Sequence, residues 1–175
     1  MSPSSRLILL PVAALVASAP AQAMVYMSTE QAQKLMFGDA ALPPVPLALT
    51  PEQTAAIEKD SGVKVFAGGL RAWKAADGWF FVDAVIGKHD LITYAVALDA
   101  AGKVRQVEIL EYREAYGGEV RNPRWRAQFT GKQHGDALSI GEGIQNISGA
   151  TLSCTHVTDG IRRLLSTYAI AVAGH

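Results

Sequence analysis

The sequence has a single cysteine, Cys154, among its 175 residues, and it has no excess of charge of either sign. One cysteine cannot form an internal disulfide, so the fold must depend on its hydrophobic core. The 16 basic and 16 acidic side chains balance, and no basic tract or zinc-finger spacing occurs. Nucleic-acid binding is therefore not indicated. The four histidines are too scattered for a zinc or haem site, and no C-x-x-C-H motif is present.

The N-terminus has the pattern of a secretory signal peptide. Arg6 ends a short positive segment, residues 7–16 form an apolar run, and Ala21-Gln22-Ala23 places small residues at the cleavage positions. The run is shorter than the roughly 20 residues that span a bilayer. We therefore expect residues 1–23 to be a cleaved signal peptide on an exported, periplasmic protein. An uncleaved anchor is the alternative.

Two helices are predicted before the middle of the chain. Ser28 can cap the first, which runs to Phe37 with apolar residues at helical spacing. The proline-rich stretch 42–46 should then interrupt regular structure, because proline lacks an N–H donor and restricts the residue before it. The second helix begins at Thr50-Pro51-Glu52-Gln53, a capping box with proline at the first helical position. It should end near Gly62.

Four β-strands are predicted in the middle of the chain, where Val, Ile, Phe, Tyr and Trp are frequent. Turn-forming segments of two to four residues, at 77–78, 87–90 and 99–102, separate the strands. Such links form antiparallel hairpins, whereas a parallel crossover needs a dozen or more residues. The expected strands are residues 63–73, 79–86, 91–98 and 103–112. A Rossmann fold is disfavoured, and no G-x-G-x-x-G motif occurs.

The last third of the chain should be helical at both ends. Asn122 and Pro123 can start a short helix that carries Trp125 and Phe129 four residues apart. Residues 131–147 should be mostly loop. A final helix should begin just after Thr151 and run to about Val172, with an apolar stripe interrupted by Arg162 and Arg163. This helix should therefore pack on the sheet. The stripe consists of Val157, Ile161, Leu164, Leu165, Tyr168 and Val172.

The segment Ser148-Gly149-Ala150-Thr151 lies directly before that final helix. Gly149 allows backbone angles that other residues avoid, and Ala150 adds little bulk beside the threonine. At a helix N-terminus, unpaired N–H groups and the positive end of the helix dipole favour an anion. Ser153 and Thr155 would add hydroxyls nearby. The alternative is an ordinary helix start built from small and capping residues.

Several segments together are similar to the FMN-binding domain family, which includes the C subunit of the sodium-translocating NADH:quinone oxidoreductase and the G subunit of the Rnf complex. The similarity covers roughly residues 78–167. One departure is Gln145, since the family commonly has an acidic residue three positions before the serine. The segments are residues 87–94, 107–114 and 117–119, Trp125, residues 129–132, and residues 148–151.

The resemblance implies an α+β fold, an antiparallel β meander flanked by helices, with a C-terminal helix following the flavin attachment loop. It also implies FMN bound covalently to Thr151 through a phosphoester, installed by a flavin transferase. Electrons would pass to or from a membrane-bound electron-transfer protein at the outer face of the cytoplasmic membrane. The expected domains are the signal peptide (1–23), an N-terminal helical segment (24–62) and the FMN-binding domain (63–175).

The expected cofactor site combines the attachment segment with residues farther back in the chain. Lys132 could face a phosphate or reduced flavin, His89 could hydrogen-bond the ring, and Gly117 could let the backbone approach it closely. Each has a plain alternative as a solvated side chain or an ordinary turn. Trp125 and Phe129 are expected in the core, and Cys154 is expected to be buried and inert. The full set is Thr151, Ser148, Gly149, Ala150, Ser153, Lys132, Gly117 and His89.

The expected function is electron transfer rather than catalysis by a stand-alone enzyme. The sequence offers no second domain that could supply acid and base groups for substrate turnover. Two alternatives stay open: a flavin-dependent reductase of a small acceptor, and a flavin-free binding or structural module of a membrane complex. Gln145 is compatible with the second alternative.

Overall fold

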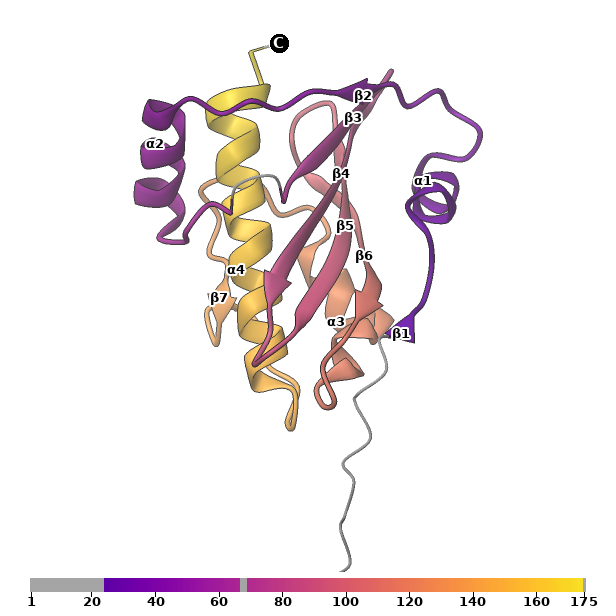
Figure 1. The fold of residues 1–175 in the computed structure, drawn as a ribbon, viewed down its shortest axis with the longest axis vertical. Helices are drawn as coiled ribbons and strands as arrows, with labels where there is room; N and C mark the ends of the chain where they lie inside the picture. The colour runs from indigo at the N-terminus through magenta and orange to yellow at the C-terminus, as the bar shows by residue number, and fades with distance from the viewer. Residues whose placement is uncertain (1–23, 67–68, 175) are drawn as a thin grey trace, which may run out of the picture.

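A six-stranded antiparallel sheet forms the centre of the protein, in the strand order β1-β6-β5-β4-β3-β2 (Figure 1). The computed structural model describes residues 24–66 and 69–174. The three central strands have nine residues each. The strands are β1 (Met24–Val25), β2 (Pro44–Val45), β3 (Arg71–Ala75), β4 (Gly78–Ile86), β5 (Leu91–Asp99) and β6 (Val104–Tyr112).

The predicted meander is confirmed. Strand β4 pairs with β5 along its whole length, from Gly78 opposite Asp99 to Ile86 opposite Leu91. Strands β3 and β6 then pair antiparallel with β4 and β5, respectively. The predicted bounds of β4, β5 and β6 agree with the observed strands to within one residue at each end. The short links between consecutive strands were therefore sufficient to predict their antiparallel pairing.

The prediction of a strand from residue 63 onwards was wrong for its first part, since β3 begins at Arg71. Side chains of helices, rather than a neighbouring strand, bind the backbone here. The Val65 N–H donates to Glu58 Oε1 at 3.0 Å, and the Lys64 carbonyl accepts from Arg163 Nη1 at 2.9 Å. The β-forming residues around position 65 therefore lie against helices.

Both edge strands were absent from the sequence prediction. Pro44 and Val45 pair with Trp73 and Ala72 of β3, inside the stretch where prolines were expected to prevent regular structure. Proline is tolerated here because β2 is an edge strand, so a missing N–H need not break a ladder. At the other edge, Met24 and Val25 pair with the end of β6.

The two predicted N-terminal helices are present as α1 (Thr29–Phe37) and α2 (Pro51–Ser61). Each begins with a complete capping box. Ser28 Oγ accepts from the Gln31 N–H at 3.2 Å, and Thr50 Oγ1 accepts from the Gln53 N–H at 3.2 Å. Helix α2 ends at Gly62, which adopts the left-handed conformation typical of helix ends.

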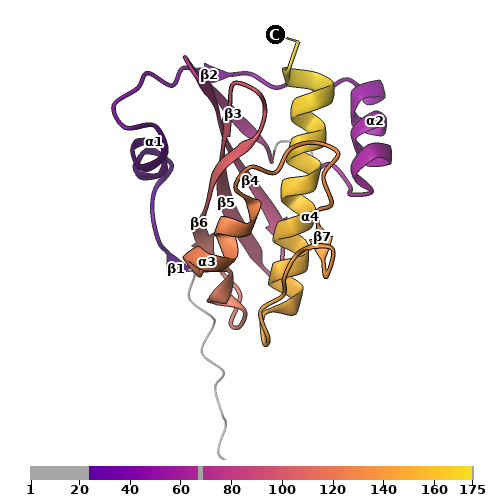
Figure 2. The same ribbon diagram turned by 180° about the vertical axis from the view of Figure 1, so that it is seen from behind.

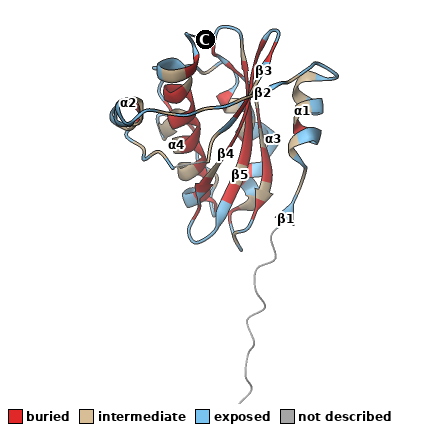
Figure 3. Ribbon diagram, turned by 45° about the horizontal axis from the view of Figure 1, so that its top comes forward, coloured by how far each residue is buried: buried red, intermediate tan, exposed pale blue. Residues whose placement is uncertain are grey.

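Helices cover both faces of the sheet. Helix α4 (Thr151–Thr167), extended by the π-helical turn η3 (Tyr168–Val172), packs on one face, and α1 packs on the other (Figures 1 and 2). Helix α2 lies against α4. Buried residues follow the central strands and α4 (Figure 3). The final helix thus packs on the sheet, as predicted.

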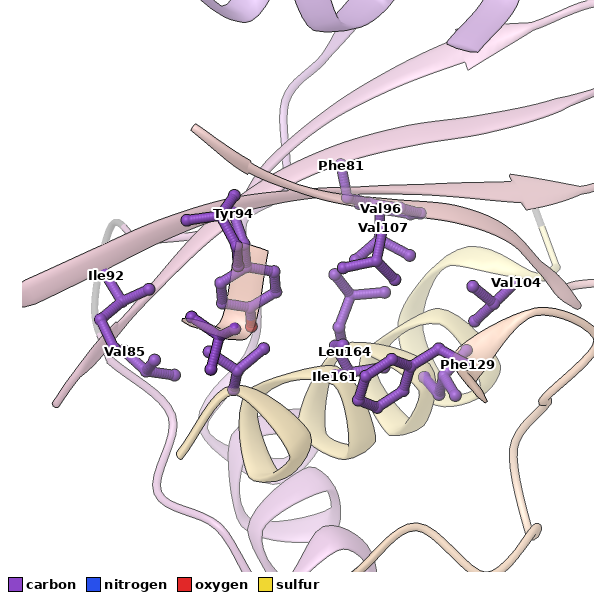
Figure 4. Close-up of a cluster of buried hydrophobic side chains, with 14 of the residues drawn as sticks. Phe81, Val85, Ile92, Tyr94, Val96, Val104, Val107, Phe129, Ile161 and Leu164 are labelled. Atoms are coloured by element: carbon purple, nitrogen blue, oxygen red, sulfur yellow. The ribbon is translucent and has the colours of Figure 1, made fainter. Parts of the chain in front are cut away.

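The main core fills the space between the sheet and α4. Tyr94, Val96 and Val107 point from the strands towards Ile161 and Leu164 of the helix (Figure 4). All five side chains are almost completely buried. A smaller cluster on the opposite face joins the sheet to α1. The main cluster thus holds α4 on the sheet, and the first residue of this helix is Thr151.

A buried ion pair also joins α4 to the sheet. Arg163 Nη2 donates to Asp83 Oδ2 of β4 at 2.7 Å, and the Tyr94 hydroxyl donates to the same oxygen at 3.0 Å. Burial raises the pKa of the Tyr94 hydroxyl, and the neighbouring Asp83 charge raises it further. The guanidinium and the carboxylate are almost fully buried. Arg163 is thus a structural anchor.

The short helix α3 (Pro123–Arg126) and the 3-10 turn η2 (Ala127–Phe129) follow the 3-10 turn η1 (Gly118–Arg121). Asn122 caps α3 through a hydrogen bond from the Arg124 N–H at 2.9 Å. Trp125 and Phe129 are buried edge to face with ring centroids 5.2 Å apart, which confirms the core assignment. The loop that follows contains only the two-residue strands β7 (Ser139–Ile140) and β8 (Gly143–Ile144).

The predicted signal peptide, residues 1–23, lies outside the described residues. Among the helices formed by residues 24–66 and 69–174, none is long and apolar enough to cross a membrane.

Candidate functional site

A cavity of about 520 Å³ lies at the end of the sheet where β4 turns into β5 and where β6 ends. Three segments line it, namely residues 88–89 of the turn, residues 114–117 after β6, and residues 149–153 at the start of α4. Its volume falls in the range of roughly 300–1,000 Å³ that is usual for small-molecule sites. The fold therefore brings together three segments at this cavity, and the first of them lies about 60 residues before the segment that contains Thr151.

Six of the eight predicted site residues line this cavity: His89, Gly117, Gly149, Ala150, Thr151 and Ser153. The other two do not. Ser148 is exposed beside Gly149. Lys132 lies near the opposite end of β6, where its carbonyl accepts from the Val104 N–H at 2.8 Å.

Thr151 is the first residue of α4, and its side chain is exposed. The Asn146 side-chain amide donates to Thr151 Oγ1 at 2.8 Å. Thr155, one turn later, uses its hydroxyl differently, because its Oγ1 donates to the Thr151 carbonyl at 2.9 Å. Thr151 is therefore the more exposed of these two threonines, and its hydroxyl oxygen is bonded to the preceding loop, whereas the Thr155 hydroxyl is bonded to the helix backbone.

The N-terminus of α4 differs from those of α1 and α2. Ala150 occupies the N-cap position, and no side chain among the described residues caps the helix there. The first-turn N–H groups of an α-helix have no partner within the helix. The 17-residue helix therefore directs its unpaired donors and the positive end of its dipole towards the cavity. An anion would find these donors already in place.

The core fixes the loop that leads to Thr151. Trp125 Nε1 donates to the Gln145 carbonyl at 2.8 Å, and the Gln145 N–H donates to Gln128 Oε1 at 2.8 Å. Gly149 then turns the chain with a positive φ of 88°. The Gln145 side chain is exposed. The position at which the family commonly has an acidic residue is thus accessible from outside.

Glu114 holds the turn between β4 and β5 on the other side of the cavity. Its Oε1 accepts from the N–H groups of His89 at 2.5 Å and Asp90 at 2.9 Å. Desolvation would raise the pKa of Glu114, but these hydrogen bonds outweigh it and lower the pKa below its usual value. A Cβ at Gly87 would come within 2.7 Å of the same oxygen. The Glu114 carboxylate is therefore a clamp for the turn that carries His89.

Gly117 is required by close packing rather than by an ordinary turn. It adopts a φ of 95°, and a Cβ there would lie 2.5 Å from Ser153 Oγ and 2.7 Å from the Tyr112 hydroxyl oxygen. Ser153 and Tyr112 are themselves hydrogen-bonded at 2.8 Å, and the Tyr112 hydroxyl also donates to the Tyr116 carbonyl. Burial raises the pKa of Tyr112. The Ser153 hydroxyl thus joins α4 to the end of β6, and Tyr112 joins the end of β6 to the loop that follows.

The rim of the cavity is apolar and exposed. Tyr116 is 87% exposed and Leu152 is 50% exposed, and both line the cavity. Ile86 and Leu91, which pair beside the neighbouring turn, are also exposed. Large apolar side chains at a concave surface often mark a binding site. Lys88 adds a positive charge to the lining.

Four of the residues around Thr151 were not predicted as site residues. Asn146 donates to its hydroxyl oxygen, and Lys88, Tyr116 and Leu152 line the cavity. Lys88 lies in a segment that resembles the family, so it could have been proposed. The exposure of Tyr116 and Leu152 depends on how distant segments meet, and local sequence carries no signal for it.

Cys154 is fully buried, and burial raises the pKa of its thiol. The prediction that it is buried is confirmed. Over the described ranges 24–66 and 69–174, no group of three or more His, Cys, Asp or Glu side chains could hold a metal ion.

The cavity coincides with a recognised domain. Residues 87–166 match the family model described as FMN-binding domain. This match includes the turn at 88–89, the loop at 114–117 and the helix start at 149–153, so it contains every segment of the cavity lining. A search of curated proteins found no match. The chain therefore contains an FMN-binding domain at residues 87–166, and it is a flavin-binding protein.

Proposed function

We propose that the protein carries FMN bound covalently to Thr151 through a phosphoester and relays electrons between this flavin and a membrane-bound redox protein. One observation carries the proposal: inside the FMN-binding domain, an exposed threonine hydroxyl lies at the uncapped N-terminus of α4, beside the 520 Å³ cavity. When bound, FMN supplies the redox chemistry, and the protein binds and orients it.

The first turn of α4 fits a phosphate on Thr151. The Ala150 N-cap leaves the first-turn amides without a side-chain partner among the described residues, and Lys88 adds a positive charge across the cavity. A helix N-terminus stabilises a nearby charge by only about 0.3–1 kcal/mol at an exposed site. That is too weak to retain a cofactor for long, so a covalent bond to Thr151 would have a clear advantage.

The rest of the cavity fits a planar aromatic ring. Tyr116 and Leu152 offer apolar surface that is otherwise in contact with water. Gly149 and Gly117 both keep side-chain bulk away from the cavity walls. Because the cavity lies at the surface, a bound ring would stay within reach of a second protein. An electron relay needs such access, whereas it needs no acid or base for substrate turnover.

Export and the membrane-bound partner belong to the same proposal. They rest on the signal-peptide pattern of residues 1–23 and on the resemblance to subunits of membrane electron-transport complexes. The protein would then receive FMN from an exported flavin transferase. Gln145 is the one observation that favours a different function, a flavin-free binding or structural module, because an acidic residue is common there in the family.

Labelling by a transferase tests the covalent bond. The chain is co-expressed with a flavin transferase, denatured, and examined for in-gel flavin fluorescence and for a mass increase equal to FMN minus water. Thr151→Ala should abolish both signals. Thr155→Ala is the matched control, because the Thr155 hydroxyl is bonded to the helix backbone one turn away, and it should stay labelled.

The outcomes separate the candidate functions. An unlabelled wild type would overturn covalent attachment and favour the flavin-free module. Fluorescence that persists in Thr151→Ala would move the attachment site elsewhere. Detection of the labelled chain in the periplasmic fraction, and its loss from that fraction when residues 1–23 are deleted, would support export.

A further inference from the structure

Asn146 makes a direct contact with the proposed attachment atom. Its side-chain N–H donates to Thr151 Oγ1 at 2.8 Å, across the turn at Gly149. Both side chains are exposed, so the contact lies where a transferase could reach it. Trp125 and Gln128 hold the neighbouring Gln145 backbone on the protein core, so the loop that carries Asn146 is firmly placed.

The direction of this hydrogen bond determines what the threonine hydroxyl can do. A hydroxyl has one proton to donate and two lone pairs with which to accept. The Asn146 N–H occupies one lone pair and so restricts the rotation of the Thr151 side chain. The hydroxyl proton and the second lone pair must then point away from Asn146, where they are available to an incoming reactant.

We infer that Asn146 is a positioning residue for attachment of the flavin: it orients the Thr151 hydroxyl for phosphoryl transfer and then holds the resulting phosphoester. This inference rests on the proposed function. The FMN phosphate must arrive in activated form, as the phosphoanhydride of a flavin dinucleotide. The Thr151 Oγ1–P bond forms, the anhydride P–O bond breaks, and the mononucleotide leaves with the bonding electron pair. The hydroxyl proton passes to a base of the transferase or to water, and no atom changes its oxidation state.

An amide is suited to both stages of this reaction. Before transfer, Oγ1 is a hydroxyl oxygen that can accept from Asn146. After transfer it is an ester oxygen with no proton, and it can still accept. A carboxylate at position 146 could only accept a hydrogen bond at neutral pH, and it would repel the negative phosphate. The two side chains have nearly the same shape, so Asn146→Asp tests the direction of the bond.

The test measures labelling kinetics at increasing concentrations of purified transferase with an excess of the flavin dinucleotide. At saturating transferase, Asn146→Ala should lower the labelling rate constant by about tenfold, as for loss of one ordinary hydrogen bond. The half-saturating transferase concentration should stay the same, because the hydroxyl is misoriented but the docking surface is intact. Asn146→Asp should be slower than Asn146→Ala. The control Gln133→Ala replaces another exposed amide side chain and should label at the wild-type rate.

A second measurement detects the hydrogen bond without any labelling. In the unmodified ¹⁵N-labelled protein, Thr151→Val should shift the side-chain NH₂ signals of Asn146 and leave those of Asn122, which caps α3, in place. Thermal melting of each variant should match the wild type, since the Asn146–Thr151 contact is exposed.

The outcomes separate this inference from the proposed function. If Thr151 is labelled in the wild type but Asn146→Ala reacts at the same rate, the positioning role is overturned and covalent attachment stands. An Asn146→Asp variant as fast as the wild type would overturn it too, because the side chain would then act as an acceptor. Absence of label from the wild type, or label in Thr151→Ala, would overturn both.

Discussion

The two ends of helix α4 differ in whether their polar groups have hydrogen-bond partners. At the C-terminal end, Arg163 is buried against Asp83, and Thr167 donates to the backbone one turn earlier. At the N-terminal end, Ala150 provides no cap and the Thr151 side chain is exposed. At the C-terminal end of α4 (the satisfied end), the polar groups therefore have hydrogen-bond partners inside the core. At the N-terminal end (the unsatisfied end), the first-turn N–H groups lack side-chain partners in the part of the chain that the structure describes and lie beside a cavity.

The difference shows how the fold can tolerate an incomplete helix start. A missing N-cap costs about 0.5–2 kcal/mol, and that cost persists only if packing elsewhere holds the helix in place. Ile161, Leu164 and Arg163 provide that packing along the inner half of α4. Departures from local rules of this kind are expected at functional sites. The N-terminal end of α4 is therefore where a ligand should act.

The largest predicted effect is at the satisfied end. Asp83→Asn should destabilise the protein by about 3–5 kcal/mol, because it leaves the buried Arg163 guanidinium without its counter-charge. Urea unfolding of the unlabelled protein measures this free energy. The double variant Asp83→Leu with Arg163→Met should recover much of the loss, since it removes both charges. If the single variant unfolds at the same urea concentration as the wild type, the Arg163–Asp83 ion pair does not anchor α4 to the sheet.

The second prediction concerns the loop that faces the unsatisfied end. Gly117→Ala should cost about 1–3 kcal/mol, because alanine is strained at positive φ and its Cβ would lie 2.5 Å from Ser153 Oγ. Gly131→Ala is the matched control: its φ is 82°, and nothing lies within 4 Å of the added Cβ. Urea unfolding should give Gly117→Ala a lower free energy of unfolding than Gly131→Ala. Equal stabilities would mean that only the backbone angle matters and that the loop does not pack tightly on α4.

The third prediction uses pH to test the clamp opposite Thr151. The pKa of Glu114 is lowered in the folded protein, so the unfolded chain binds more protons as the pH falls. The stabilisation is therefore fully present above the unfolded value near 4.5 and is lost as the pH falls through the lower folded value. Urea unfolding between about pH 3 and pH 6 should show a shallower pH dependence for Glu114→Gln than for the wild type. If the wild type and Glu114→Gln show the same pH dependence of the unfolding free energy, the Glu114 carboxylate does not stabilise the turn that carries His89.

The parts of the fold set by neighbouring residues were predictable. Ser28 and Thr50 were identified as caps because each bonds a residue three positions later. The meander followed from turns too short for any other connection. Arg163 was different, because its partner Asp83 lies 80 residues away and nothing local connects them. A similar long-range contact contributes to the misassignment of residues 63–66, since Arg163 of the distant helix α4 binds the Lys64 carbonyl.

The lining of the candidate site was predictable where it comes from one segment of the sequence. Residues 148–151 are consecutive in the sequence, so their resemblance to an attachment motif could be seen directly. Ser153 was predicted to lie near the cofactor, and it does line the cavity. The sequence did not predict that its hydroxyl is bonded to Tyr112 of β6. Lys132 was proposed from its charge and from the resemblance of residues 129–132 to the family, and it lies beside Val104 at the opposite end of β6 from the cavity. The charge of a side chain indicates which groups it could bind, but it does not predict how far the side chain lies from Thr151 in the fold.

The smallest predicted effect on stability is at the rim of the unsatisfied end. Leu152 is 50% exposed, so Leu152→Ala should change the free energy of unfolding by no more than about 0.5 kcal/mol. If the rim covers the flavin ring, however, the same change should weaken non-covalent binding of FMN by about fivefold, as expected for about 1 kcal/mol of lost apolar contact. Titration of the unmodified chain with FMN, followed by flavin fluorescence, measures this. Leu35→Ala is the control, because Leu35 is 55% exposed on α1, which packs on the opposite face of the sheet from α4. Equal FMN affinities for the two variants would place the ring away from Leu152, and the exposed apolar rim would then need another occupant.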